Sequence, residues 1–487
     1  MRKSALSYDR GTLVLHPPPK GKAWVDFAVW DDRIEKFRVP ARDYRKLLEA
    51  CKTEGIEIED RARYFRELEL KPLVQEPFKH QQEALESWIR AKRQGVVVLP
   101  TGAGKTFVAQ MAIEATPRST LIVVPTLDLM HQWYANLKAA FPDTEVGLLG
   151  GGSKDDSPIL VATYDSAAIY AEKLGNQYAL QIFDECHHLP GDFVRTIAEY
   201  SIAPYRLGLT ATPERGDNKH TDLDTLIGPI IYRKAPEDLA GGALSEHKIK
   251  QIKVTLSDTE RAEYDRLIAQ RNDFLNRSKI SLGTLDGWQR FVQASGRSKE
   301  GRAAMLAHRN ARQIAFGTEA KLLTLADLLE QHHQDRVLVF TDDNNMVYRI
   351  SQAFLIPAIT HQSKVKERHE ILQNFREGEY PRVVTSRVLN EGVDVPEANV
   401  AIILSGTGTT REYVQRLGRI LRRGEGKLAL LYEVIAENTA EENVSKRRRG
   451  EYKPEERGKV KEDRKDQNQS RLFERIDSEE SLGFDDL

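Results

Sequence analysis

Short apolar runs alternate with amphipathic stretches along the first half of this chain, and this alternation predicts its architecture. Each apolar run has the length of a strand buried on both faces, and each amphipathic stretch repeats apolar residues at helical spacing. Strands alternating with helices predict a parallel, doubly wound sheet that binds its ligands at the carboxyl ends of the strands. The expected strands are residues 96–99, 121–124, 159–163 and 180–183, and the expected helices include residues 107–115 and 127–137.

This rhythm is interrupted and then returns. Residues 258–316 are rich in charge and have a helical pattern, which predicts an inserted helical arm. The basic residues of the arm could contact a nucleic-acid backbone or could form an ordinary solvated face, and the pattern leaves both open. Strand-like runs at 337–341, 382–385 and 399–404 then predict a second α/β domain.

The two ends of the chain differ from its middle. Strand-like runs at 12–15 and 24–30 and an amphipathic stretch at 44–50 predict a small α/β module, in which Trp24, Phe27 and Trp30 alternate as core residues do. Near the other end, mixed charge with few apolar residues is typical of disorder. The predicted divisions are 1–75 for the N-terminal module, 76–245 for the first, nucleotide-binding domain, 258–316 for the arm, 317–440 for the second domain and 441–487 for a charged tail.

A glycine-rich loop joins the first predicted strand of the first domain to its helix. Glycine lets the backbone turn its N–H groups toward phosphate oxygens, and the helix N-terminus adds its partial positive charge. In such a loop Lys105 would reach the β- and γ-phosphates of a nucleotide, and Thr106 would place its hydroxyl on Mg²⁺. Leu99 stands where the general pattern has glycine. The expected nucleotide-binding residues are Leu99, Pro100, Thr101, Gly102, Ala103, Gly104, Lys105 and Thr106.

Gln81 lies near the start of a predicted helix upstream of this loop. Its amide offers one donor group and one acceptor, which match the N6 and N7 positions of adenine. A glutamine at a helix start is also a common solvated cap, and the sequence leaves the two roles open.

Two adjacent carboxylates follow a later predicted strand. Asp184 and Glu185 come directly after residues 180–183, so a parallel sheet would place them at the same edge as the glycine-rich loop. We expect Asp184 to hold the hydration shell of Mg²⁺ and Glu185 to polarise the water that attacks the γ-phosphate. A zinc site at Cys186 and the following histidines is disfavoured, because consecutive side chains diverge and no C-x-x-C or H-x₃-H partner is present.

The second predicted domain has no phosphate loop of its own but carries an arginine-rich segment at 415–422. Arg419 and Arg422 have the spacing that places two side chains on one face of a helix. Two guanidinium groups on one face can bind a γ-phosphate presented by the first domain. Such charge neutralisation accelerates phosphoryl transfer by orders of magnitude, so we expect both arginines to act between the domains.

Composition narrows the class of protein. With 73 acidic and 72 basic residues among 487, the whole-chain charge gives no preference for nucleic acid, and any basic surface must be local. The two cysteines, Cys51 and Cys186, are too few for a disulfide framework. Because no secretory pattern and no apolar run of about 18 residues is present, we expect a cytoplasmic protein without a membrane partner.

Together these motifs resemble those of superfamily 2 helicases, and more narrowly the XPB family of DNA-repair and transcription helicases in its compact archaeal or bacterial form. The resemblance implies two RecA-like doubly wound parallel-sheet domains, a damage-recognition-like N-terminal module and a thumb-like helical arm. Gly392 and Asp394 would then belong to the nucleotide site as part of motif V. The other matches are residues 99–106 to motif I, 184–187 to motif II, 210–212 to motif III and 415–422 to motif VI.

The resemblance also implies nucleic-acid contacts. Residues 124–127 with Gln132 and Trp133 look like motif Ia, and residues 162–166 look like its neighbour. After motif III the family usually shows Arg-Glu-Asp, whereas this chain has Gly216 in the middle position. The expected contacts are Pro125, Thr126, Gln132, Thr163, Tyr164, Arg215 and Thr385.

The function implied by this resemblance is an ATP-dependent 3′–5′ DNA helicase or duplex translocase in repair of the nucleotide-excision type. ATP and Mg²⁺ would be its cofactors, and single-stranded, duplex or forked DNA its partner. The family also implies a nuclease partner in archaea, and we expect the chain alone to be a monomer. An ATP-gated DNA clamp that positions a nuclease and an RNA helicase are the alternatives that the sequence leaves open.

Overall fold

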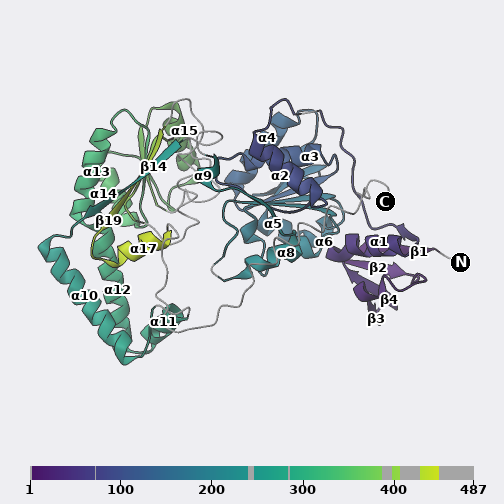
Figure 1. Ribbon diagram of the computed structural model, residues 1–487, viewed down its shortest axis with the longest axis horizontal. Coiled ribbons are helices and arrows are strands. Elements are labelled where there is room, and N and C mark those ends of the chain that lie inside the picture. The colour runs from purple at the N-terminus through teal and green to yellow at the C-terminus, as the bar shows by residue number, and fades with distance from the viewer. Residues whose placement is uncertain are drawn as a thin grey trace.

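Three β-sheets organise the chain, one in each of three successive parts (Figure 1). This computed structural model describes residues 3–71, 73–215, 217–239, 246–282, 286–386, 398–405 and 428–448. Four predicted site residues, Gly392, Asp394, Arg419 and Arg422, lie outside the described residues, as do Gly216 and residues 449–487. Within the described ranges, no helix is both long enough and apolar enough to cross a bilayer.

The N-terminal module is a five-stranded sheet in the order β3-β4-β2-β1-β5 with one α-helix packed against it. Trp24 is buried in its core, whereas Trp30 on the edge strand β3 is 47% exposed. The prediction of core packing is therefore right for Trp24 and wrong for Trp30, because an edge strand has no neighbour on one side. The elements are β1 (Ser4–Asp9), β2 (Thr12–His16), β3 (Val29–Asp31), β4 (Lys36–Pro40), α1 (Tyr44–Thr53) and β5 (Ile58–Asp60).

The first α/β domain is built on an eight-stranded sheet in the order β13-β6-β12-β11-β7-β10-β8-β9. All its strand pairs are parallel except the terminal β8–β9 hairpin. The central strands β12, β11 and β7 are buried along their whole length, which explains their nearly continuous apolar runs. The strands are β6 (Gln94–Val98), β7 (Thr120–Val124), β8 (Val146–Gly150), β9 (Ser153–Lys154), β10 (Ile159–Thr163), β11 (Leu180–Asp184), β12 (Tyr205–Thr210) and β13 (Ile230–Arg233). The helices are α2 (Lys79–Arg90), α3 (Lys105–Glu114), α4 (Leu127–Ala140), α5 (Tyr164–Ile169), α6 (Ala171–Leu174), α7 (Thr196–Glu199), α8 (Leu223–Leu226) and α9 (Pro236–Leu239).

The second α/β domain has a six-stranded sheet in the order β14-β19-β18-β15-β17-β16, parallel throughout. With the first domain, it confirms the predicted fold of two doubly wound parallel sheets. Arg368 of α15 forms an ion pair with Asp128 of α4 at 3.2 Å, so the two domains are in contact. The elements are β14 (Glu246–Val254), α13 (Glu319–Gln331), β15 (Val337–Phe340), α14 (Asn344–Phe354), β16 (Ala358–Ile359), α15 (Val365–Glu377), β17 (Arg382–Thr385), β18 (Val400–Ile403), β19 (Leu428–Ala436) and α17 (Ala440–Arg448).

The helical arm consists of α10 (Asp258–Arg277), α11 (Gly287–Arg297) and α12 (Lys299–Gly317), with α11 at its far end (Figure 1). It does not lie between the two sheets as predicted, because β14, which precedes it in the chain, already belongs to the second sheet. Tyr264 and Leu267 of α10 and an alanine stripe on α12 pack into the core of the second domain. Only the end of the arm has a core of its own, which contains Leu275, Phe291 and Ala304.

The predicted boundary of the tail is also corrected. Residues 440–448 form α17, and its Glu441 makes a buried ion pair with Lys321 of α13 at 2.7 Å. The charged composition of this segment gave no sign that Glu441 is buried, since the residue that neutralises it, Lys321, lies far away in the sequence.

Candidate nucleotide and nucleic-acid site

The glycine-rich loop turns at the carboxyl end of β6, and α3 begins at Lys105. Gly102 and Gly104 have φ angles of 87° and 80°, in the left-handed region that glycine adopts most readily. A Cβ at Gly104 would also collide with the side-chain amide of Gln81. The loop thus has the backbone conformation of a phosphate cradle at a helix N-terminus.

Two side chains of this loop carry donor groups that could bind phosphate oxygens. The Lys105 ammonium donates to the Leu99 carbonyl at 3.2 Å, and the Leu99 N–H donates to the Thr210 carbonyl at 3.0 Å. The Thr101 hydroxyl is buried and has no hydrogen-bond partner among the described residues. A bound phosphate would supply the acceptor that this hydroxyl lacks.

Asp184 ends β11 and is held by two donors. Its Oδ2 accepts a 2.8 Å hydrogen bond from Trp133 Nε1, and its Oδ1 accepts one from the Glu185 N–H at 3.0 Å. Burial, followed by the nearby charge of Glu185, raises the pKa of Asp184 to about 6, and Lys105 and the Trp133 N–H act against this rise. The carboxylate is therefore oriented, and a nearby cation would favour its ionised form.

Glu185 has a left-handed backbone, with φ of 46° and ψ of 52°. For a residue with a side chain this conformation costs roughly 1–2 kcal/mol, and such strain is concentrated at functional sites. Its Oε2 lies 3.4 Å from the Thr210 hydroxyl and 3.4 Å from His187 Nδ1. The strained turn thus places a carboxylate next to the end of β12.

The loop after β12 is bonded to the acidic segment. Thr210 Oγ1 lies 3.1 Å from His187 Nδ1 and accepts from the Thr212 N–H at 3.2 Å. The Arg215 guanidinium donates to the His187 carbonyl at 2.6 Å and forms a bidentate pair with Asp217. Movement of either segment would therefore be transmitted to the other.

Gln81 is buried against the glycine-rich loop, and its amide is already in use. Its Oε1 accepts from the Phe78 N–H at 2.9 Å, and its Nε2 donates to the Ala103 carbonyl at 3.2 Å. Nε2 also lies 3.5 Å from the Gly104 carbonyl, so both N–H groups face the loop and the amide keeps one lone pair of Oε1 for adenine. His80, whose role no sequence pattern indicates, also bonds the Ala103 carbonyl, at 2.8 Å.

Comparison with known proteins decides the family. Residues 6–62 match the xeroderma pigmentosum group B helicase damage recognition domain, residues 75–215 the type III restriction enzyme res subunit, and residues 320–424 the helicase conserved C-terminal domain. Over 423 residues the chain is 43% identical to the DNA 3'-5' translocase XPB2 of Sulfurisphaera tokodaii, covering 86% of this chain and 95% of that protein. The chain belongs to the XPB family.

Other XPB-family proteins extend beyond the part that this chain matches. The DNA 3'-5' helicase XPB of Mycobacterium tuberculosis is 29% identical over 361 residues, covering 71% of this chain and 58% of that protein. The solved helicase domain of Pyrococcus furiosus Hef aligns over 75% of this chain and 96% of that chain, with 19% identity and a TM-score of 0.49. The family resemblance inferred from the motifs is confirmed by the family matches and by the identity to the Sulfurisphaera tokodaii protein.

The residues expected to contact nucleic acid fall into two groups in this XPB-family chain. Thr126 and Thr163 are N-caps of α4 and α5 at strand ends, and Pro125 and Gln132 lie half-buried near them. Tyr164 and Thr385 are buried: the Tyr164 hydroxyl donates to the Asp184 carbonyl at 3.0 Å, and the Thr385 hydroxyl donates to the Ser386 carbonyl at 3.1 Å. In this structure the side chains of both residues point into the protein at strand ends, and their contact with nucleic acid stays a prediction.

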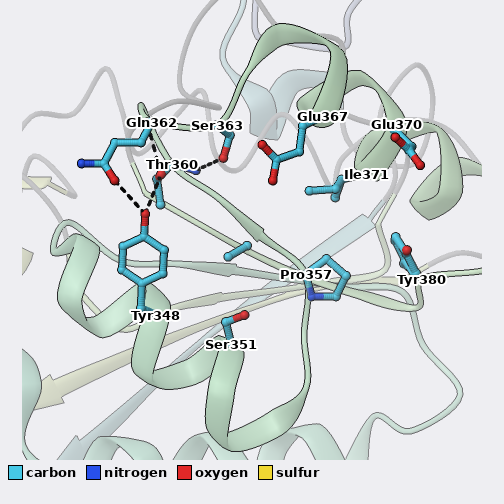
Figure 2. Close-up of a pocket in the computed structure, with 11 residues that line it drawn as sticks. Tyr348, Ser351, Pro357, Thr360, Gln362, Ser363, Glu367, Glu370, Ile371 and Tyr380 are labelled. Atoms are coloured by element: carbon cyan, nitrogen blue, oxygen red, sulfur yellow. Dashed lines mark hydrogen bonds between the residues drawn. The ribbon is translucent and has the colours of Figure 1, made fainter.

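The second domain contains a pocket of about 510 Å³ beside its edge strand β16 (Figure 2). Figure 2 shows the Tyr348 hydroxyl between Thr360 and Gln362, at 3.3 and 3.1 Å. The charged residues that line it, Glu367 and Glu370, are both acidic. This pocket would repel a phosphate and is distinct from the nucleotide site.

Proposed function

We propose that this chain is an ATP-driven 3′–5′ DNA translocase and helicase that acts in DNA repair. Lys105, Asp184 and Glu185 lie together at the carboxyl edge of one parallel sheet, and this arrangement is the main support for the proposal. The names of the Sulfurisphaera tokodaii and Mycobacterium tuberculosis relatives, a DNA 3'-5' translocase and a DNA 3'-5' helicase, support the same activity.

In this proposal the loop residues bind the nucleotide, and the acidic residues prepare its hydrolysis. Lys105 exchanges the Leu99 carbonyl for phosphate oxygens, and Glu185, held near Thr210 and His187, orients the attacking water. Thr106 and Asp184 would hold Mg²⁺, which neutralises charge on the β- and γ-phosphates when bound.

The network from Glu185 through Thr210 to Arg215 supports coupling between hydrolysis and DNA. Through His187 it joins the edge of the sheet that carries Glu185 to the loop after motif III, where Arg215 is proposed to contact DNA. Arg419 and Arg422 of motif VI are proposed to complete the site from the second domain. Gly392 and Asp394 are proposed to contribute from motif V.

The experiment is a side-by-side measurement of ATP hydrolysis with single-stranded DNA, duplex DNA and RNA, together with strand displacement. Stimulation by DNA but not by RNA, with displacement that requires ATP, supports the proposal. Equal stimulation by RNA would favour an RNA helicase, and ATP hydrolysis without displacement would favour a clamp that positions a nuclease.

A further inference from the structure

A second cavity, of about 430 Å³, lies between the N-terminal module and the first domain. Arg93 directly precedes β6, Arg118 lies just before β7, and Tyr205 begins β12, and all three line the cavity. The cavity is therefore at the amino-terminal edge of the sheet, opposite the edge that carries the glycine-rich loop.

Hydrogen bonds between the N-terminal module and the first domain hold together the junction that surrounds this cavity, here called the junction cavity. The Tyr8 hydroxyl donates to the Tyr200 carbonyl at 2.9 Å, and Arg45 donates to the Pro204 carbonyl at 3.0 Å. The Tyr64 N–H donates to the Asn176 carbonyl at 2.9 Å. The cavity is thus preformed, and its volume lies in the range of small-molecule sites.

The charged residues that line it favour an anion. Three are arginines, Arg63, Arg93 and Arg118, and one is an acid, Glu67. Arg118 pairs with Glu67, and Arg63 pairs with Asp60 at 3.2 Å. Arg93 has no ion-pair partner within the described part of the chain, and its guanidinium lies 5.3 Å from the ring centre of Tyr205.

Two donors in the cavity lining have no acceptor within the described part of the chain. The Arg93 Nε and the Thr116 hydroxyl are both buried without a hydrogen-bond partner among the described residues, and Thr116 is only 4% exposed. Leaving such a donor unpaired costs about 1–3 kcal/mol, so native proteins rarely retain two at one place without a ligand or water.

The backbone at Arg93 is also unusual. Lys92 and Arg93 have consecutive positive φ angles of 55° and 60°, although neither is glycine. Each such residue costs roughly 1–2 kcal/mol. Hydrogen bonds of 2.9 Å from the Arg93 N–H to the Trp88 carbonyl and from the Arg206 N–H to the Arg93 carbonyl hold this turn in place. The strained turn is what places the Arg93 side chain over Tyr205.

From these observations we propose that the junction cavity is a phosphate-binding site. The Arg93 guanidinium and the Thr116 hydroxyl would donate to phosphate oxygens, which are acceptors only and match a guanidinium in geometry. The phosphate can come from a free anion or from the backbone of DNA that reaches the N-terminal module. The second-domain pocket, with its two glutamates, shows none of these features.

The test uses the full chain carrying Lys105→Ala, so that phosphate binding at the glycine-rich loop is weakened in every variant. Calorimetric titration with inorganic phosphate at constant ionic strength should show affinity about tenfold lower in Arg93→Gln and lower by a smaller factor in Thr116→Val. Arg90→Gln is the matched control, because Arg90 is exposed and, among the described residues, its guanidinium bonds only the Ser87 hydroxyl. Thr116→Val keeps the shape of the side chain, so it remains informative if Arg93→Gln does not fold.

A second experiment identifies the source of the phosphate. The same variants are titrated with a short DNA duplex over a range of salt concentrations. Loss of phosphate affinity alone assigns the site to a free anion, and an added loss of duplex affinity with a shallower salt dependence assigns it to the DNA backbone. Unchanged phosphate affinity in both Arg93→Gln and Thr116→Val overturns the proposal. These readouts involve no ATP turnover, so they can fail while the proposed function stands.

Discussion

The indole N–H of Trp133 donates a 2.8 Å hydrogen bond to Oδ2 of Asp184, and both side chains are buried. Trp133 lies on α4, the helix that follows the motif Ia strand end, so this bond joins motif Ia directly to motif II. A hydrogen bond to a charged group is worth about 1.5–3 kcal/mol, and this one opposes the burial that raises the pKa of Asp184.

Trp133→Phe should lower the affinity of the nucleotide site for Mg²⁺, because it removes this donor and keeps an aromatic ring. We expect the Mg²⁺ concentration for half-maximal ATP turnover to rise about tenfold. Trp88→Phe is the control, since Trp88 is equally buried but donates to the Arg206 backbone carbonyl, at 2.9 Å. An identical Mg²⁺ dependence in the two variants would show that Trp133 only fills space.

A single substitution that breaks the buried Lys321–Glu441 ion pair should greatly destabilise the protein. Lys321→Met leaves Glu441 buried without its cation and should lower the free energy of unfolding by about 3–5 kcal/mol. Combining it with Glu441→Leu should recover most of this loss, because two apolar residues need no partner. Denaturant unfolding monitored by circular dichroism measures both, and a single variant as stable as the wild type would contradict the buried pair.

Deleting the end of the arm should leave the second domain folded, whereas deleting the whole arm should not. Replacing residues 272–304 by a short linker removes only the small core around Phe291 and should leave the melting temperature nearly unchanged. Removing 258–316 should unfold the second domain, since Tyr264 and Leu267 belong to its core.

If the basic residues of the arm end contact DNA, the shorter deletion should lower duplex affinity and make its salt dependence shallower. Fluorescence anisotropy measures both quantities. The same affinity and the same slope would assign these residues to a solvated face.

The side chain of His308 should make the stability of the end of the arm depend on pH. Burial, followed by the charges of Arg271 and Arg312, lowers the pKa of His308 to about 4. As the pH falls, His308 therefore binds a proton in the unfolded state at a higher pH than in the folded state. The arm end should be fully stable above about pH 6.5 and lose stability as the pH falls toward 4.

Trp288 reports this change, since its ring centre lies 5.4 Å from that of His308. Its fluorescence should change between pH 6.5 and 4 in the wild type, whereas His308→Gln, which can still accept from Arg271, should flatten the profile. An unchanged profile in the variant would assign the effect to other groups.

The fold was predictable because its central strands are buried on both faces and therefore have uninterrupted apolar runs. The positions of Lys105, Asp184 and Glu185 followed from the same pattern, since parallel strands bring their carboxyl ends to one edge. Burial of polar groups by distant partners was not predictable: Glu441 pairs with Lys321, and Tyr164 turns inward to bond the Asp184 carbonyl. Nor did local spacing show that β14 joins the second sheet before the arm begins, because that pairing is with β19, far along the chain.

Glu185 is proposed to drive hydrolysis while Lys105 holds the nucleotide, and separate measurements of binding and hydrolysis distinguish these two roles. ATP affinity and single-turnover hydrolysis are determined for the wild type, Glu185→Gln and Lys105→Ala with saturating DNA. Glu185→Gln should keep its ATP affinity and lose about a hundredfold or more in hydrolysis rate, whereas Lys105→Ala should lose ATP affinity itself. Hydrolysis at a near wild-type rate in Glu185→Gln, or an equal loss of ATP affinity in both variants, would contradict these roles.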